Sequence, residues 1–333
     1  MQALSAAASP SGASVAGERD RIRIGVSACL LGEPVRFDGG HKRSHFVTDE
    51  LAPFVEFVRV CPEVESGMST PRPAVRLVRG DEGARMLEVK SGLDHTERME
   101  TYAELRVQAL LAEDLSGFIL KKDSPSCGMT RVKTHGRTGM PIRDGVGLFA
   151  GALMRSQPDL PVEEEGRLHD AALRENFIER VFAYVRLRSH FARDWTSGEM
   201  IAFHTAQKLH LMAHSPKAYQ SLGRLVAEHH QMDRDEFERS YVGEFMAALK
   251  VLATRGRQTN VLQHAAGYLK KQLDAASRAE LAELIEDYRQ GLVPLSVPVA
   301  LVRHHVRVHE IDYLQGQVHL DPHPKELMLR NHV

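Results

Sequence analysis

The stretch IRIGVSACLLG, residues 22–32, decides the fold of the first half of the chain. It is a short run rich in Ile and Val that ends in a turn, which is typical of a buried β-strand. Similar runs recur as FVEFVRV, ARMLEV and LSGFILK, and a helical period over residues 95–113 separates the last two. Alternation of strands and helices favours a parallel sheet covered by helices. We therefore predict an α/β, Rossmann-like domain over residues 21–190.

Beyond about residue 190 the pattern changes to long amphipathic helical periods with few strand signals. Clear examples are AYQSLGRLVAEHH (218–230) and RAELAELIEDYRQGL (278–292). These periods predict a mostly α-helical, bundle-like domain over residues 198–333, with the boundary near 190–200. Pro294 and Pro298 interrupt the helical signal, and residues 303–317 give no clear prediction. The first 20 residues are rich in Ala, Ser and Gly, and we expect a disordered tail there.

The overall composition is that of a folded protein without a global charge bias. Of the 333 residues, 43% are apolar and 26% are charged, and the formal net charge is −1. A nucleic-acid partner would therefore have to be held by a local basic patch. No apolar run is long enough to span a bilayer, and the N-terminus lacks the features of a signal peptide. We expect a cytoplasmic protein with no membrane association, in which disulfides between its three cysteines are improbable.

Each of the three cysteines stands shortly after an apolar run. Cys29 follows IRIGVSA, Cys61 follows VEFVRV, and Cys127 follows GFILKKDSPS. Because the strands of a parallel sheet all end on the same edge, cysteines far apart in the sequence can meet there. Their flanking sequences are turn-rich and polar, whereas a core cysteine would have apolar neighbours. Three converging thiolates predict a metal site.

Two metal chemistries fit three thiolates, namely zinc with a further His or carboxylate ligand, and an iron–sulfur cluster. The close cysteine pairs that are usual in zinc modules are not found in the sequence. A 4Fe-4S cluster on three thiolates leaves one iron open, which implies a substrate. From the residues alone two further interpretations stay open, namely ordinary buried cysteines at strand ends and an unpaired nucleophile.

Three motifs, SACLLGEPVRFDGG (27–40), CPE (61–63) with SGMSTPRP (66–73), and LKKDSPSCG (120–128), resemble those of the TudS-type thiouracil desulfidases. They occur in the same order, and the resemblance covers roughly residues 22–188. KLHLMAHSPKAYQSLG and TNVLQHAAGYLKKQL resemble the YbgA-type helical domain. The combination is similar to the RudS-type desulfidases, which act on 4-thiouridine of tRNA. The resemblance implies a 4Fe-4S cluster on Cys29, Cys61 and Cys127.

The resemblance also implies that Glu63 and a serine of SPSCG transfer the protons. Ser124 is the first candidate for that serine and Ser126 the second. The expected reaction is hydrolytic: the open iron binds the thiocarbonyl sulfur, water attacks the ring carbon, and uridine and hydrogen sulfide are formed. A carboxylate beside an apolar pocket can have a raised pKa and serve as base and then as acid. The alternative for Glu63 is a solvated carboxylate that caps the turn after Cys61.

Several polar residues are candidates for substrate binding. Asp38 belongs to a tight Asp-Gly-Gly turn from which its carboxylate can reach the edge of a base, while Arg72, Lys121 and Lys122 can neutralise a phosphate or a sulfide. Exposed basic residues are, however, more often simply solvated. Residues 245–273 contain no acidic residue, and such a segment can follow a phosphate backbone. Its candidates for RNA contact are Lys250, Arg255, Arg257, Lys270 and Lys271.

Histidines are concentrated beyond residue 200, and His204, His210 and His214 lie in a second acid-free stretch, residues 201–227. Because no third carboxylate or cysteine accompanies a histidine pair there, we expect surface or core histidines and no second metal. The predicted function is a desulfidase of a thiolated uracil base, foremost 4-thiouridine in tRNA. The alternatives are a desulfidase of free thiouracil or thiouridine and a non-catalytic metal–thiolate sensor. The oligomeric state is not predicted.

Overall fold

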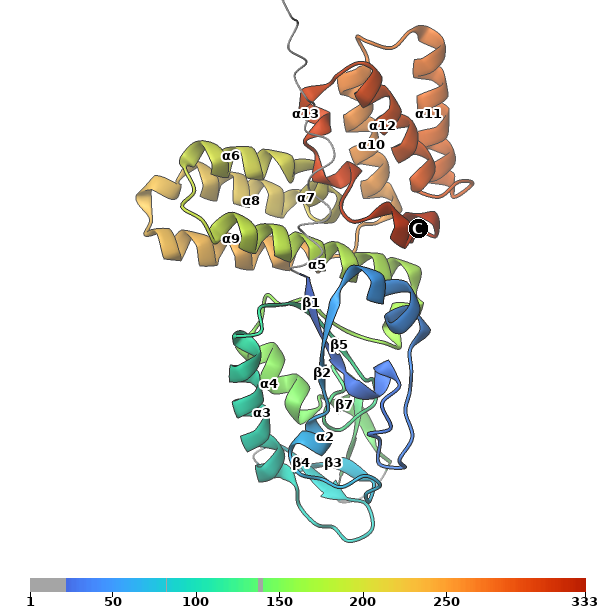
Figure 1. Ribbon diagram of the computed structural model, residues 1–333. Coiled ribbons are helices and arrows are strands. Elements are labelled where there is room, and N and C mark those ends of the chain that lie inside the picture. Colours follow the sequence, from blue (N-terminus) through green and yellow to red (C-terminus); the bar gives the residue numbers. More distant parts are fainter. Residues whose placement is uncertain (1–21, 82, 137–139) are drawn as a thin grey trace, which may run out of the picture. The chain divides into compact units, whose positions relative to one another are not determined.

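The computed structural model describes residues 22–333 with the exception of 82 and 137–139 (Figure 1). The tail predicted over residues 1–20 lies outside the described residues. The packing divides the chain into two compact units, of which the first ends at Ala152 and the second covers Leu153–Val333. None of the described helices is long and apolar enough to cross a membrane.

A parallel sheet forms the centre of the first unit. Strand β1 (Arg23–Ser27) pairs in parallel with β2 (Glu56–Val60) on one side and with β5 (Leu115–Leu120) on the other. Within the first unit the strand order is β2-β1-β5, and strand β8 covers Val162–Glu164 of the second unit. All six residues of β5 are buried, as is usual for a strand inside a parallel sheet. Three of the predicted strands are therefore neighbours, and the predicted α/β class is confirmed.

A second, mixed sheet has the strand order β4-β3-β6-β7. β3 (Val75–Arg79) pairs antiparallel with β4 (Ala84–Glu88) and parallel with β6 (Val132–His135), and β6 pairs antiparallel with β7 (Ile142–Gly145). The run ARMLEV is β4, so its prediction as a strand of the parallel sheet was wrong. The chain turns back between Gly80 and Gly83, and a connection this short permits only antiparallel pairing of β3 with β4.

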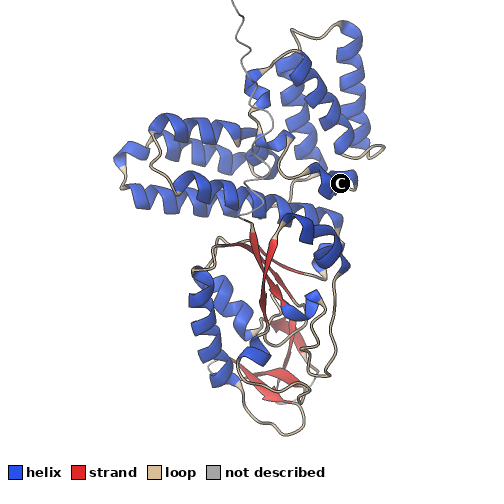
Figure 2. Cartoon of the chain, in the orientation of Figure 1, coloured by secondary structure: helices blue, strands red, loops and turns tan. Residues whose placement is uncertain are grey.

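Helices accompany the strands of the first unit (Figure 2). α3 (Thr96–Leu111) matches the helix predicted over residues 95–113, and its buried Met99, Ala103, Val107 and Leu110 recur at helical spacing. The other α-helices are α2 (Pro62–Glu65) and α4 (Leu148–Ser156). The shorter turns are a 3-10 helix at Ala28–Leu31, a π-helix at Phe46–Leu51 and a 3-10 helix at Ala52–Phe54.

The second unit is built mostly of helices, which confirms the predicted class of the C-terminal region. The α-helices are α5 (Ala171–Phe191), α6 (Ser197–Ala206), α7 (Lys208–His214), α8 (Pro216–Ala227), α9 (Arg234–Leu249), α10 (Arg255–Leu269), α11 (Ala275–Gln290), α12 (Ser296–Val308) and α13 (Asp312–Gln315). Single 3-10 turns lie at Arg167–His169, His229–Gln231, Val318–Leu320, Lys325–Leu327 and Leu329–Asn331.

The division between the units falls earlier than the boundary expected near residues 190–200. α5 belongs to the second unit, because its Ala183 and Leu187 share a hydrophobic core with Tyr241 and Phe245 of α9. An apolar stripe shows that a helix is packed but not which core it joins. Pro298 does not interrupt a helix either, since it lies in the first turn of α12, where its missing N–H has no partner to lose.

Candidate functional site

A pocket of about 350 Å³ is lined by all three cysteines. Cys29 lies in the 3-10 helix directly after β1, Cys61 directly follows β2, and Cys127 follows β5 by a short turn. Because β1 lies between β2 and β5 and all three are parallel, their carboxyl ends share one edge of the sheet. Sequence positions that are far apart thus meet where the strand pattern predicts.

The chemistry of these sulfur atoms fits a soft metal centre. Cys29 and Cys127 are buried, Cys61 is partly buried, and all three are free thiols. Burial raises the pKa of the Cys61 and Cys127 thiols, although hydrogen bonds from Ser27 and Ser126 act in the opposite direction on Cys127. Thiolates in such surroundings need a nearby positive charge, and a bound metal supplies it and removes the thiol protons.

Glu63, in the first turn of α2, is held from two sides. Its Oε2 accepts a hydrogen bond of 2.9 Å from Nε of Arg72 and a second one from Nη2 of the same guanidinium, and its Oε1 accepts from Ser126 Oγ at 2.8 Å. The side chains of Arg72 and Glu63 are 3% and 13% exposed. Arg72 also donates to the carbonyl oxygens of Val35 and Ser69. Glu63 is therefore not a solvated turn cap. Arg72, which also lines the pocket, orients Glu63, and its contact with substrate stays a prediction.

The two candidate serines differ in what they contact. Ser126 Oγ lies 2.8 Å from Glu63 Oε1 and 3.7 Å from Cys127 Sγ. Ser124 Oγ accepts from the backbone N–H groups of Cys127 at 3.1 Å and Ser126 at 3.3 Å, and lies 2.9 Å from Ser126 Oγ. Ser124 thus shapes the turn, while Ser126 touches the carboxylate and a cysteine. The geometry favours the second candidate over the first.

The loop that carries Ser126 is fixed against the N-terminus of α4. The N–H groups of Leu148 and Ala150, which have no partner inside the helix, donate to the carbonyl oxygens of Pro125 and Ser126. A Cβ atom on Gly147 would lie 2.5 Å from the Ser126 carbonyl oxygen. Only glycine permits this close approach, which locks the serine loop in place.

Two residues predicted at the substrate are placed differently. Asp38 Oδ1 accepts from the Gly40 N–H at 3.0 Å, and this hydrogen bond lowers the pKa of the exposed Asp38. Asp38 is not among the residues that line the pocket and stabilises the turn, so its contact with substrate stays a prediction. Lys121 does line the pocket, as does its neighbour Lys122.

Arg36, Phe37 and Lys42 are among the pocket residues that the sequence patterns did not single out. Phe37 is 40% exposed, and the Arg36 guanidinium lies 5.4 Å from the centre of its ring. All three belong to or directly follow the first cysteine motif. An aromatic residue in an otherwise polar, turn-rich motif is a candidate for stacking on a base, and this signal was available in the sequence.

Three of the five basic residues predicted to contact RNA bind main-chain carbonyls within their own unit. The distances from side-chain nitrogen to carbonyl oxygen are 2.8 Å for Lys250, 2.7 Å for Arg255 and 2.9 Å for Arg257. The guanidinium groups of Arg255 and Arg257 thereby join helix ends. Contact of the five residues with RNA stays a prediction. Lys270 and Lys271 are exposed at the end of α10.

The first unit is an α/β protein with a thiolate-lined pocket at its sheet edge, and comparisons with known proteins identify its family. The family model described as 2-thiouracil desulfurase matches residues 24–165, and the one described as Protein of unknown function (DUF1722) matches residues 208–324. The uncharacterized protein YbbK of Bacillus subtilis (strain 168) is 31% identical over 150 residues, which are 44% of this chain and 97% of YbbK. The chain belongs to the 2-thiouracil desulfurase family and carries a DUF1722 domain in addition.

Two further similar proteins were found. The uncharacterized protein YbgA of Escherichia coli (strain K12) is 32% identical over 158 residues, which are 47% of this chain and 94% of YbgA. One similar solved structure is a 4Fe-4S-dependent thiouracil desulfidase, TudS, at 36% identity, with a TM-score of 0.38 and coverage of 44% of this chain and 93% of that chain. The predicted fusion of a TudS-type and a YbgA-type domain is thereby confirmed.

Proposed function

We propose that this chain is an iron–sulfur-dependent desulfidase that removes sulfur from a thiolated uracil base. The observation that carries the proposal is the pocket in which three cysteines adjoin the Glu63–Ser126 pair. Cys29, Cys61 and Cys127 would hold a 4Fe-4S cluster, which their soft donor atoms suit. When bound, such a cluster supplies a Lewis-acidic iron without a protein ligand that has affinity for sulfur.

Glu63 and Ser126 would move the protons of the reaction. Hydrolysis replaces the C=S bond by a C=O bond from water and releases hydrogen sulfide, so both protons of the water finally reach the sulfur. Ser126 Oγ can accept a proton from the attacking water while its own proton passes to Glu63 Oε1, 2.8 Å away. Arg72 holds Oε2, so that Oε1 is the oxygen left to receive and return the proton.

We further propose that the substrate is 4-thiouridine within a cytoplasmic tRNA and the product uridine. The exposed ring of Phe37 offers a stacking surface for a base, and Lys42, Lys121 and Lys122 at the same pocket attract phosphate. Flipping a nucleotide out of its stack costs a few kcal/mol, which such contacts offset. A free base carries no phosphate for these lysines to bind, and this favours a nucleotide substrate.

Anaerobic purification followed by iron and sulfide analysis and a sulfide-release assay tests the desulfidase proposal. We expect about four iron atoms per chain and release of sulfide from thiolated substrate. Glu63→Gln should keep its iron but lose activity by about 10²- to 10⁴-fold, while Glu104→Gln, on the exposed face of α3, should have no effect. Iron without sulfide release from any thiolated uracil would favour the sensor alternative. Full activity of Glu63→Gln would remove its role in proton transfer.

The substrate proposal is tested with 4-thiouridine-containing tRNA, free 4-thiouridine and 2-thiouracil side by side. Lys270→Glu combined with Lys271→Glu reverses two exposed charges of the acid-free segment. This double variant should raise the KM for tRNA and leave turnover of the free nucleoside unchanged, because only a polymer has a phosphate backbone for these lysines to contact. Turnover of the free base alone would support the alternative substrate.

A further inference from the structure

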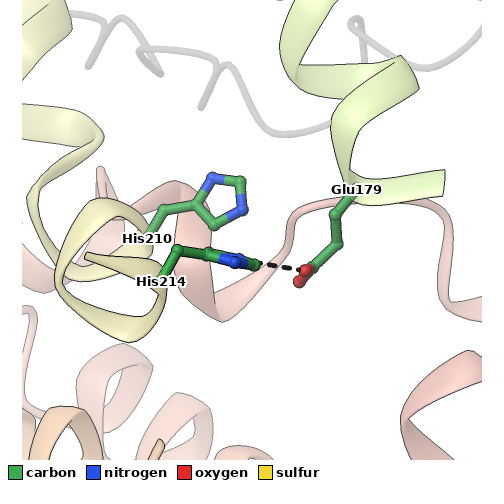
Figure 3. A group of neighbouring side chains, drawn as sticks. All are labelled: Glu179, His210 and His214. Carbon is green, nitrogen blue, oxygen red and sulfur yellow. Dashed lines mark ion pairs between the residues drawn. The ribbon is translucent and has the colours of Figure 1, made fainter. Parts of the chain in front are cut away.

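A second group of metal-binding side chains is buried in the helical unit, apart from the cysteine pocket. It consists of Glu179 on α5 with His210 and His214 on α7 (Figure 3). One ligand atom from each residue lies within 4.8 Å of the other two, and their exposed fractions are 3%, 0% and 1%. His210 and His214 are one helical turn apart and therefore lie on the same face of α7.

The hydrogen bonding of His214 requires a positive species between its ring and Glu179. Nδ1 lies 2.6 Å from the carbonyl oxygen of Val251, which can only accept, so Nδ1 carries a hydrogen. Nε2 of the neutral ring is then an acceptor, yet it lies 3.3 Å from Glu179 Oε2, another acceptor. Two lone pairs at this distance repel unless a proton or a metal ion joins them. A carbonyl on the other ring nitrogen is the usual partner of a metal-bound histidine.

Neighbouring histidines have ring nitrogens that the described part of the chain leaves without a hydrogen-bond partner. This holds for both ring nitrogens of His210 and of His319, and both side chains are completely buried. Their ring centres lie 6.5 Å apart. A buried polar atom without a partner costs about 1–3 kcal/mol, so several in one interior indicate a ligand.

Arg330 leaves the relevant oxygen of Glu179 available. Its Nη2 donates to Oε1 of Glu179 at 2.9 Å, and its Nε donates to Glu175 at 2.8 Å. Oε2 of Glu179 is the atom directed at His214. Glu179 therefore keeps one carboxylate oxygen directed toward the histidines.

We propose that Glu179, His210 and His214 bind one divalent transition-metal ion, for which zinc is the best match. Two imidazoles and one carboxylate form a known zinc ligand set, and His319 beside His210 offers a further nitrogen. The complete burial of the group indicates a structural ion, which would join α5 to α7 within the helical unit. This site does not depend on the desulfidase proposal.

Metal analysis of the full-length chain, expressed with added zinc, tests the site. Because the cysteines can also take up zinc, the analysis includes the variant Cys29→Ser, Cys61→Ser, Cys127→Ser. About one zinc per chain should remain in that variant. His210→Gln combined with His214→Gln should lose it. The matched control is His204→Gln, a buried histidine of the same unit that contacts Tyr241 at 3.0 Å outside the group.

Cobalt provides a second measurement that does not rely on the folding of any variant. Co²⁺ added to the chelator-treated wild-type chain should give ligand-field absorption from a nitrogen- and oxygen-ligated site, in addition to the sulfur charge-transfer bands of the cysteines. Zinc alone should raise the Tm reported by Trp195 fluorescence by several degrees. Zinc content that is the same in the histidine double variant and the control would overturn the proposal. Cobalt spectra that show only thiolate ligation would do so too, because a proton would then join His214 to Glu179.

Discussion

Replacement of Arg72 by methionine tests whether this residue acts by holding Glu63. The guanidinium donates to Glu63 Oε2 and to two carbonyl oxygens, those of Val35 at 3.0 Å and Ser69 at 3.2 Å. Methionine keeps much of the apolar stem but removes every donor. The substitution therefore leaves the Glu63 carboxylate and both carbonyls with fewer partners in a nearly closed environment.

The expected loss of stability follows from the burial of the pair. Removal of one partner of a buried ion pair costs about 3–5 kcal/mol. Glu63 is 13% exposed and keeps its hydrogen bond from Ser126, so we expect the lower end, about 3 kcal/mol. Arg72→Lys restores the charge but not the two-nitrogen contact and should lose less. Glu63→Gln combined with Arg72→Met should be more stable than the sum of the single losses predicts, by about 1–3 kcal/mol.

Urea unfolding of the full chain measures these differences with an internal reference. Trp195 is the single tryptophan and lies in the core of the helical unit, so its fluorescence reports that unit. In Arg72→Met the circular-dichroism transition of the α/β unit should move to lower urea while the Trp195 transition stays in place. A stability change below about 0.5 kcal/mol, the usual size for a surface substitution, would refute the reasoning. Strict additivity in the double variant would refute it as well.

Three further predictions concern the serine loop, its support and the helical unit. Ser126→Ala should lower sulfide release by about 10²- to 10⁴-fold at unchanged iron content. Ser124→Ala should mainly cost about 1 kcal/mol of stability. Equal activity losses in the two variants would contradict the assignment of Ser126 as the serine that transfers protons. Gly147→Ala places a Cβ atom 2.5 Å from the Ser126 carbonyl oxygen. Urea unfolding should therefore show a loss of about 1–3 kcal/mol in the free energy of unfolding, and sulfide release should be reduced. Wild-type values in both assays would argue against the locked loop. Burial lowers the pKa of His204 to about 4, and because the unfolded chain keeps a histidine pKa of about 6.5, it binds more protons between these values. The free energy of unfolding of the helical unit should therefore fall by roughly 3 kcal/mol through His204 as the pH falls from 6.5 to 4. His204→Gln should reduce this dependence on pH, measured by unfolding followed by Trp195 fluorescence. An unchanged pH dependence in the variant would exclude the effect.

The meeting of the three cysteines was predictable because it depends only on strand direction. Apolar runs before Cys29, Cys61 and Cys127 identify buried strands, and parallel strands end together. Helical periods were equally informative for the second unit. The boundary between the units could not be predicted from the sequence, because an amphipathic stripe such as that of α5 fits the core of either unit.

Individual side-chain roles were harder to predict because they depend on hydrogen bonds that leave no periodic signal. Arg72 and Lys121 look alike in sequence as basic residues near a cysteine motif. In the structure both residues line the pocket, but Arg72 is buried and donates its hydrogen bonds to Glu63 and to backbone carbonyl oxygens. The choice between Ser124 and Ser126 likewise depends on which hydroxyl faces Glu63, and the chain path around Pro125 decides this.

Glu179 shows what kind of signal the sequence does contain for a distant partner. It stands next to Phe177, Ile178 and Val181, all buried on α5, where a carboxylate costs free energy unless a charge or donor compensates it. Arg330 and His214, which the fold brings to it, are far away along the chain. A search for histidine pairs with a carboxylate nearby in sequence misses such a site. An acidic residue inside an apolar helical stripe, read together with His210 and His214 one turn apart, is the combination that points to it.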